Sequence, residues 1–251
     1  GGVIHVISDK ESYSKVEDCL PKFINTIGLK NPSPKTSRSD DEFAKMLLVK
    51  NEKFLPEMEI FTTSSQVGYS SSVMNASGLG TKETVAEIVL AHWLSGTFLW
   101  DKIRTTGGAY GASATVSSIA KCFTFSTYRD PNPLKSVDVF IESLQEAAQV
   151  NLSNEECDKL ITGTYGEEFL PVSPATEGRI GLIRILASVS NEDQKDKLKN
   201  LLSVKPEDLK DAAERIFQNS SNTKTTVIGD KALKKYAQNK AKKTSVIVKL
   251  P

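Results

Sequence analysis

The sequence predicts an α+β fold in which a mostly antiparallel sheet carries helices packed on one face. Short β-rich runs with alternating apolar residues are spread along the chain, and four or five consecutive helices follow the central hairpin. Of the 251 residues, 39% are hydrophobic and 25% are charged, which is typical of a globular protein with a sizeable core. We therefore expect a single domain over residues 1–251.

The first quarter of the chain predicts a strand, a helix and a long connection. Residues 2–8 form a short run rich in β-branched side chains, which favours a strand. Apolar residues then recur at helical spacing from residue 12 to residue 27, so we expect a helix there. The composition turns to Pro, Ser, Lys and Asp afterwards, and residues 28–56 are expected to be rich in loops.

The next part of the chain predicts strands on both sides of a buried helix. Residues 81–103 carry apolar side chains around much of the helical circumference, as expected for a helix that is covered on most sides. Gly107 and Gly108 are expected to end this helix. Strands are expected at residues 59–61, 66–76, 109–117 and 120–128, of which the last two form a hairpin.

Helix starts in the second half are predicted from capping signals. Asn132 can accept a hydrogen bond from the first turn of a helix over residues 134–150, and Pro133 suits the first helical position. Further helices are expected to begin after Ser153, Ser173 and Lys205, before strands at residues 225–228 and 244–248 on either side of a lysine-rich helix.

Charge and cysteine content exclude several classes of partner. Lys plus Arg number 32 and Asp plus Glu number 31, so nucleic acid is not an expected partner. The lysines between residues 231 and 243 are interpreted as a solvated helix face. No apolar run approaches 18 residues, so no membrane partner is expected. Three widely spaced cysteines, Cys19, Cys122 and Cys157, fit an intracellular reducing compartment better than a disulfide framework.

No metal site is predicted within this chain. A zinc hydrolase needs two histidines on one helix face together with a carboxylate, and the two histidines here, His5 and His92, are far apart. A hydrogen-bonded packing role is expected for His92 in the apolar helix and a similar role for His5 in the first strand. No motif for a nucleophilic residue is present, and Gly78 and Gly80 lack the rest of a phosphate-binding loop.

The stretch with the most chemical content is residues 99–111, where a helix end delivers Arg104 and a strand start delivers Tyr110. Gly107 and Gly108 between them let another backbone come close. Arginine offers several donors to a carbonyl or carboxylate, and a tyrosine hydroxyl can donate to a developing oxyanion. These four residues form a candidate peptide-binding site. The alternative is a tight turn in which Arg104 is a surface charge and Tyr110 is a half-buried packing residue.

Residues 100–111 resemble the Trp-Asp-x-x-Arg-x-x-Gly-Gly-Ala-Tyr-Gly segment of the presequence-protease and falcilysin branch of the pitrilysin/insulinase superfamily. Residues 127–132 resemble the Tyr-Arg-Asp-Pro-Asn segment of this branch after the same hairpin, and residues 65–69 resemble its Gln-Val-x-Tyr strand. The resemblance covers nearly the whole chain and weakens over residues 28–56 and towards the C-terminus.

This resemblance implies that the chain is the C-terminal, fourth domain of a zinc metalloendopeptidase, which degrades short unfolded peptides in a closed chamber of two halves. It implies catalytic roles for Tyr110, which would support the oxyanion, and for Arg104, which would hold a substrate carbonyl. Gly107 and Gly108 would belong to the substrate-binding surface. Zinc and its ligands would lie in the N-terminal half of the longer protein, so this chain alone is expected to be inactive and without a cofactor.

The resemblance also implies the partners and the compartment. The expected partners are the N-terminal half of the same peptidase and unfolded peptides, in the mitochondrial matrix or a plastid. Two other interpretations remain: an inactive pitrilysin-like structural or processing-complex subunit, and an unrelated α+β binding module in which Gly-Gly-Ala-Tyr is only a turn. The presence of Arg104 and Tyr110 in the right order favours the peptidase, because an inactive scaffold has no catalytic use for them.

Overall fold

The computed structural model describes residues 3–28, 58–230, 233 and 245–249. The chain divides into two compact units, one of Gly1–Leu55 with Pro171–Val189 and the other of Pro56–Leu170 with Ser190–Pro251. Almost all of the loop expected over residues 28–56 lies outside the described residues, and so does most of the lysine-rich helix expected before the last strand.

The first unit contains two described helices, α1 (Lys10–Thr26) and α6 (Pro174–Leu186). α1 begins where the side chain of Asp9 accepts a hydrogen bond from Ser12 N at 2.8 Å. This bond stabilises the charged carboxylate, and together with the Ser12 hydroxyl it lowers the pKa of Asp9. α6 follows Ser173 as predicted.

The strand predicted over residues 2–8 is wrong for the part that the structure describes, since residues 3–9 form no strand. A strand needs a neighbour for its backbone hydrogen bonds, and none of the described strands pairs with this run. Ile7 and His5 of this run lie close to α6 instead. A Cβ on Gly178 would come within 2.4 Å of Ile7 Cδ1 and 3.3 Å of His5 Cε1, so glycine at this position makes room for the segment.

The second unit is built on a sheet of six described strands. Their bounds are β1 (Met58–Thr62), β2 (Tyr69–Asn75), β3 (Gly111–Ser117), β4 (Cys122–Tyr128), β5 (Lys224–Gly229) and β6 (Ser245–Lys249). They lie in the order β3-β4-β2-β5-β1-β6. β3, β4, β2 and β5 pair antiparallel, whereas β1 pairs parallel with β5 and β6. The sheet is therefore mostly antiparallel, as predicted.

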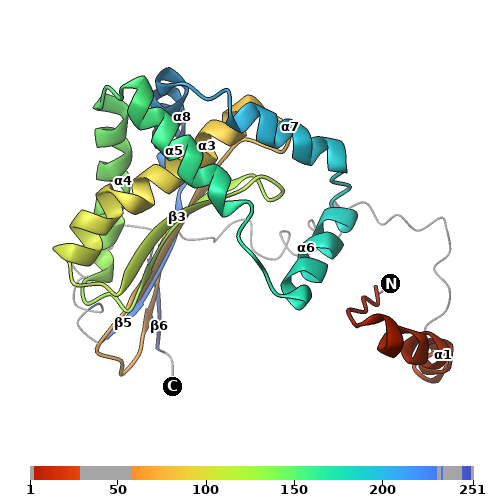
Figure 1. Cartoon of the computed structure of the whole chain (residues 1–251). Coiled ribbons are helices and arrows are strands. Elements are labelled where there is room, and N and C mark those ends of the chain that lie inside the picture. The colour runs from red at the N-terminus through yellow and green to blue at the C-terminus, as the bar shows by residue number, and fades with distance from the viewer. Residues whose placement is uncertain (1–2, 29–57, 231–232, 234–244, 250–251) are drawn as a thin grey trace. The chain divides into compact units, whose positions relative to one another are not determined.

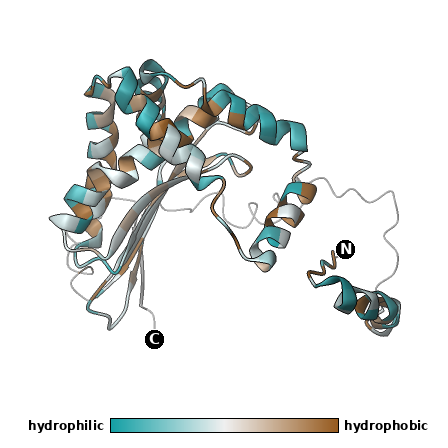
Figure 2. Ribbon diagram, in the orientation of Figure 1, coloured by the Kyte–Doolittle hydropathy of each residue, from teal (hydrophilic) through white to brown (hydrophobic). Residues whose placement is uncertain are grey.

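Helices cover one face of this sheet. Their bounds are α3 (Lys82–Gly96), α4 (Pro133–Gln149), α5 (Asn154–Glu167), α7 (Asn191–Leu201) and α8 (Pro206–Gln218). α3 and α4 contact the strands directly, and α8 packs against both helices (Figure 1). Figure 2 shows that α7 is hydrophilic along most of its length, and Leu201 is its buried residue.

Alternation along the strands explains why the described helices pack on one face. Phe123 and Phe125 of β4 are fully buried, and Phe125 stacks on Phe140 of α4 with ring centroids 4.9 Å apart. Thr124 and Ser126, between and beyond them, are only partly buried. Because successive side chains of a strand point to opposite faces, the helices pack on the phenylalanine face and leave the other face polar.

The predicted helix starts are correct, but one capping residue is wrong. Asn132 is the N-cap residue of α4, yet its side chain accepts no hydrogen bond from the helix. The buried Asp130 links the two segments instead: its Oδ1 accepts from Asn132 N and its Oδ2 from Ser136 Oγ, both at 2.7 Å. A carboxylate with two acceptor atoms thus holds the loop and the first turn together. The capping box predicted from Ser153 and Glu156 is present at α5.

The helix predicted over residues 81–103 is in two parts. α3 ends at Gly96, and a π-helical turn, η1 (Trp100–Thr105), follows. The hydroxyl of Thr97 donates to Trp93 O at 2.7 Å, a bond that competes with regular helix geometry. Thr106 N then donates to Asp101 O, five residues back, at 2.9 Å. Arg104 therefore lies on a π turn and not at the end of a long α-helix.

A buried ion pair ties α3 to α8 on the helical side of the sheet. The side chain of Glu87 is fully buried, and its Oε1 accepts from Arg215 Nε at 3.0 Å. The same carboxylate accepts from the backbone N and the hydroxyl of Ser77, at 2.9 and 2.8 Å. Three donors from two other segments therefore satisfy this buried charge.

Candidate functional site

A glycine pair turns the chain from η1 towards the sheet. Gly108 has a φ of +78°, in the left-handed region that favours glycine, and its N–H donates to Arg104 O at 3.0 Å. A Cβ on Gly107 would lie 2.5 Å from Ile103 O, so this position has no room for a side chain. Ala109 N donates to Ile103 O at 3.1 Å and closes the turn. The turn at Gly107 and Gly108 is therefore held by backbone hydrogen bonds.

Arg104 is exposed on η1, and its Cζ lies 3.9 Å from the centroid of the Trp100 ring. A guanidinium stacked on an indole is attracted to the ring face and keeps its N–H donors in its own plane. Among the described residues no acidic side chain forms an ion pair with Arg104. Its donors are therefore available to an acceptor from outside the chain.

Tyr110 directly precedes β3, and its side chain is 68% exposed. Its backbone N–H donates to Arg129 O at 3.4 Å, which extends the pairing of β3 with β4 by one residue. This exposure differs from the half-buried packing position of the alternative interpretation. The hydroxyl group is carried outside the core, where a bound molecule can reach it.

Two further tyrosines continue from Tyr110 across the sheet. The Tyr110 and Tyr128 rings meet edge to face, with centroids 5.8 Å apart and planes at 74°. Tyr128 makes a second such contact with Tyr69, at 5.6 Å and 64°. The sequence analysis placed Tyr69 and Tyr128 in motifs but predicted no contact with Tyr110, because the three residues belong to separate segments of the sequence. Their contact follows from strand order, which spacing along the chain does not reveal.

The loop after β4 brings the three sequence motifs together. Asp130 and Gly68 exchange two backbone hydrogen bonds, at 2.7 and 2.8 Å, so this loop is joined to the start of β2. Arg129 has a φ of +49°, which bends the chain between the strand and this bridge. Pro131 Cγ lies 3.6 Å from the point where a Cβ of Gly108 would be. The loop therefore contacts both the glycine turn and β2.

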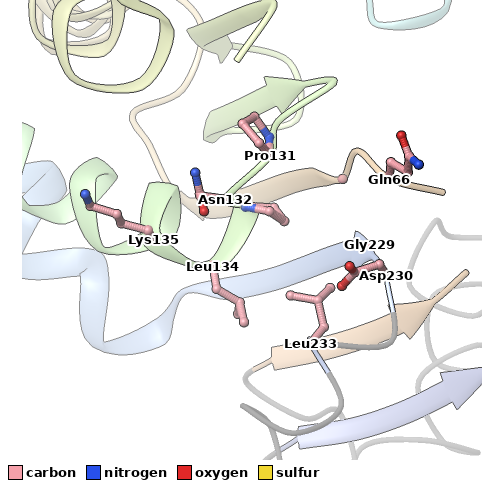
Figure 3. Close-up of a pocket in the computed structure, with 10 residues that line it drawn as sticks. Gln66, Pro131, Asn132, Leu134, Lys135, Gly229, Asp230 and Leu233 are labelled. Atoms are coloured by element: carbon pink, nitrogen blue, oxygen red, sulfur yellow. The ribbon is translucent and has the colours of Figure 1, made fainter. Parts of the chain in front are cut away.

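A cavity of about 320 Å³ lies beside this junction, between the start of α4 and the end of β5. Leu134 and Leu233 line it and belong to one buried hydrophobic cluster. Figure 3 shows these two leucines between Gln66 and Lys135, which lie at opposite ends of the pocket. Pro131 also lines the cavity, so the cavity borders the glycine turn. Its volume is at the low end of the range for small-molecule sites.

His92 has the packing role that the sequence predicts. Its Nδ1 lies 3.0 Å from Glu167 Oε1, across the contact between α3 and α5. A Cβ on Gly163 would lie 2.7 Å from His92 Nε2, so glycine at this position lets the two helices approach closely. Within the described ranges no three His, Cys, Asp or Glu side chains are grouped as metal ligands would be. Burial raises the pKa of the Cys157 thiol, so its reactive thiolate form is disfavoured.

Residues 58–230 match the protein family described as the PreP C-terminal domain. The chain is 28% identical over 216 residues to presequence protease 1, chloroplastic/mitochondrial, of Arabidopsis thaliana, a match that covers 86% of this chain and 19% of that protein. It is 36% identical over 135 residues to the mitochondrial presequence protease of Drosophila melanogaster, which covers 53% of this chain and 13% of that protein. The chain spans about a fifth or less of the length of these relatives.

Solved structures share the fold. A peptidase M16 inactive domain from Pseudomonas fluorescens has a TM-score of 0.55 and 13% identity, over 69% of this chain and 43% of that chain. A protease from Helicobacter pylori has a TM-score of 0.51 and 16% identity, over 68% of this chain and 43% of that chain. Across the described residues, no helix combines the length and the hydropathy needed to cross a bilayer.

Proposed function

The chain belongs to the PreP C-terminal domain family, and from this premise we propose that it supplies the substrate-binding part of a zinc metalloendopeptidase. The substrates proposed are short unfolded peptides, held in a chamber that this domain closes together with an N-terminal half of the same protein. The observation that carries the proposal is the exposure of Arg104 and Tyr110 on either side of a turn held by backbone hydrogen bonds.

The two side chains have different roles in this proposal. Hydrolysis of a peptide bond passes through a tetrahedral species whose oxygen gains negative charge, and the hydroxyl of Tyr110 can donate a hydrogen bond to that oxygen. The guanidinium of Arg104 can hold a substrate carbonyl before and during the reaction. The backbone of Gly107 and of the exposed Gly108 is proposed to form part of the surface along which an extended peptide lies.

The residues that the structure describes do not fit zinc. Zinc in peptidases takes nitrogen, sulfur and carboxylate ligands from closely placed side chains, and the described residues contain no such group. The proposal therefore assigns the metal, its ligands and the base that activates water to the rest of the longer protein. The relatives' names include mitochondrial and chloroplastic, and we propose one of these compartments for this protein.

Kinetics of the complete protein that contains this chain test the proposal. Tyr110→Phe is expected to lower kcat by about 10²-fold to 10³-fold with little change in KM, since the lost donor acts where charge develops. Arg104→Ala is expected to raise KM as well, because a group that holds a carbonyl also binds the ground state. Matched controls are Tyr13→Phe and Arg179→Ala, which change exposed residues of α1 and α6.

Three outcomes contradict the proposal. A complete protein that cleaves no peptide would favour the inactive pitrilysin-like subunit. Folded Tyr110→Phe and Arg104→Ala variants with unchanged turnover would remove the assigned roles. A loss of activity that follows a loss of thermal stability in both variants would support the tight-turn interpretation of this stretch.

A further inference from the structure

The side chain of Tyr110 is largely open to solvent, so the core does not hold it in one orientation. Its side chain is 68% exposed. Exposed side chains change rotamer on a picosecond to nanosecond timescale unless a contact holds them. A hydroxyl that donates to the oxyanion of a transition state must be held in one direction, because a misplaced donor lowers the catalytic rate. A contact that fixes the side chain therefore favours catalysis.

The Tyr128 ring supplies this contact. Its edge-to-face geometry, at 5.8 Å and 74°, is the arrangement that aromatic pairs prefer. Tyr128 is 53% exposed, so the contact lies at the surface and contributes little to the buried core. Gly111 pairs with Tyr128 in the β3-β4 register, which keeps the base of the Tyr110 side chain close to Tyr128.

Tyr128 is in turn held from its other side. β2 and β4 are antiparallel neighbours in which Ser71 pairs with Ser126, and Tyr69 and Tyr128 lie two residues beyond this pair on the same face. The Tyr69 ring contacts Tyr128 at 5.6 Å. Before Tyr69, a Cβ on Gly68 would lie 2.4 Å from Ile228 O, so the backbone there is closely enclosed.

From these contacts we infer that Tyr128 is a positioning residue: its ring, supported by Tyr69, holds the Tyr110 hydroxyl in the direction needed for catalysis. The inference rests on the proposed function, because it acts through Tyr110. It predicts that the ring of Tyr128 matters and that its hydroxyl does not.

A double-mutant cycle in the complete peptidase tests this inference. Tyr128→Ala is expected to lower kcat by about 3-fold to 10-fold with KM unchanged, which corresponds to the free energy of an aromatic pair. Tyr128→Phe should keep kcat close to that of the wild type, because the ring edge is retained. In a Tyr110→Phe background, Tyr128→Ala should have no further effect on kcat, since the hydroxyl that it positions is already gone. Tyr165→Ala is the control for loss of an aromatic contact elsewhere, because the ring centroids of Tyr165 on α5 and of Phe169 beyond this helix lie 4.8 Å apart.

The outcomes separate the inference from the proposed function. If Tyr110→Phe lowers kcat while Tyr128→Ala does not, the inference is wrong and the proposed function stands. An equal loss of kcat from Tyr128→Ala in the wild type and in Tyr110→Phe would also contradict the inference. Such a result would indicate a role of Tyr128 that does not depend on the Tyr110 hydroxyl. If Tyr110→Phe leaves kcat unchanged, both fail. Should Tyr128→Ala unfold, Tyr128→Leu is expected to fold and to show the same loss of kcat, and a Leu variant with wild-type kcat would overturn the inference.

Discussion

Gly107 is the residue on which the geometry between Arg104 and Tyr110 depends most directly. A methyl group at this position would meet Ile103 O at 2.5 Å, and that oxygen already accepts the hydrogen bond from Ala109 N. Gly107→Ala must therefore move backbone rather than the end of a flexible side chain. We expect a loss of about 1 to 3 kcal/mol in the free energy of unfolding, as for overpacked sites, measured by urea denaturation of the 251-residue chain.

Gly96→Ala is the matched control at the residue scale. Gly96 ends α3, and nothing lies within 4 Å of its Cβ position, so alanine should be neutral or slightly stabilising there. In the complete protein, the proposed function predicts that Gly107→Ala also lowers kcat, because the turn would present Tyr110 differently. Equal stability of the two alanine variants would show that the turn tolerates a side chain, contrary to this prediction.

The junction of α3 and α8 depends on the buried carboxylate of Glu87. Glu87→Ala removes the acceptor for Arg215 Nε and for both donors of Ser77. Removing one partner of a buried ion pair typically lowers the free energy of unfolding by about 3 to 5 kcal/mol. The side chain of Arg215 is 32% exposed and can regain water, so about 2 to 4 kcal/mol is expected here.

Thermal and urea denaturation measure this loss, and Glu155→Ala is the control. Glu155 forms an ion pair with Lys159 within α5, but its side chain is 80% exposed, and its loss should hardly change the midpoint. Arg215→Met tests the pair from the other side. If Glu87→Ala were no less stable than Glu155→Ala, the ion pair would not hold the two helices together.

Local signals predicted most elements because they act over a few residues. The capping box of Ser153 and Glu156 and the hairpin of β3 and β4 depend on neighbours in sequence, and both are present. The strand expected over residues 2–8 failed because a strand also needs a partner, which its own composition cannot supply. The π turn was missed for a similar reason, since an apolar run has nearly the same pattern in α- and π-helical geometry.

At the scale of the whole molecule, the order of strands decides what the candidate site contains. Spacing along the chain predicted Arg104 and Tyr110 as a pair, because both belong to one short segment. Tyr69 and Tyr128 come next to Tyr110 only because β4 lies between β3 and β2 in the sheet. Residues that come together from several strands can therefore be identified only once the strand order is known. Residues within one turn can be predicted from the sequence.

The distribution of metal ligands across the whole chain leads to the last prediction. Its histidines and cysteines are His5, Cys19, His92, Cys122 and Cys157. Each lies in a different segment: residues 3–9, α1, α3, β4 and α5. Because tetrahedral zinc needs several such ligands within bonding distance of one point, the 251-residue chain is expected to bind no stoichiometric zinc and to hydrolyse no peptide.

Elemental analysis of the dialysed chain and a fluorogenic peptide assay measure both expectations, with the complete protein as the positive control. The complete protein should retain about one zinc per molecule and lose its activity on chelation, whereas the 251-residue chain should be unaffected by the chelator. One zinc held per 251-residue chain through dialysis, with peptidase activity that chelation removes, would contradict the prediction. It would mean that this domain carries a metal centre of its own, and that Arg104 and Tyr110 serve a site within the same domain rather than one in the other half.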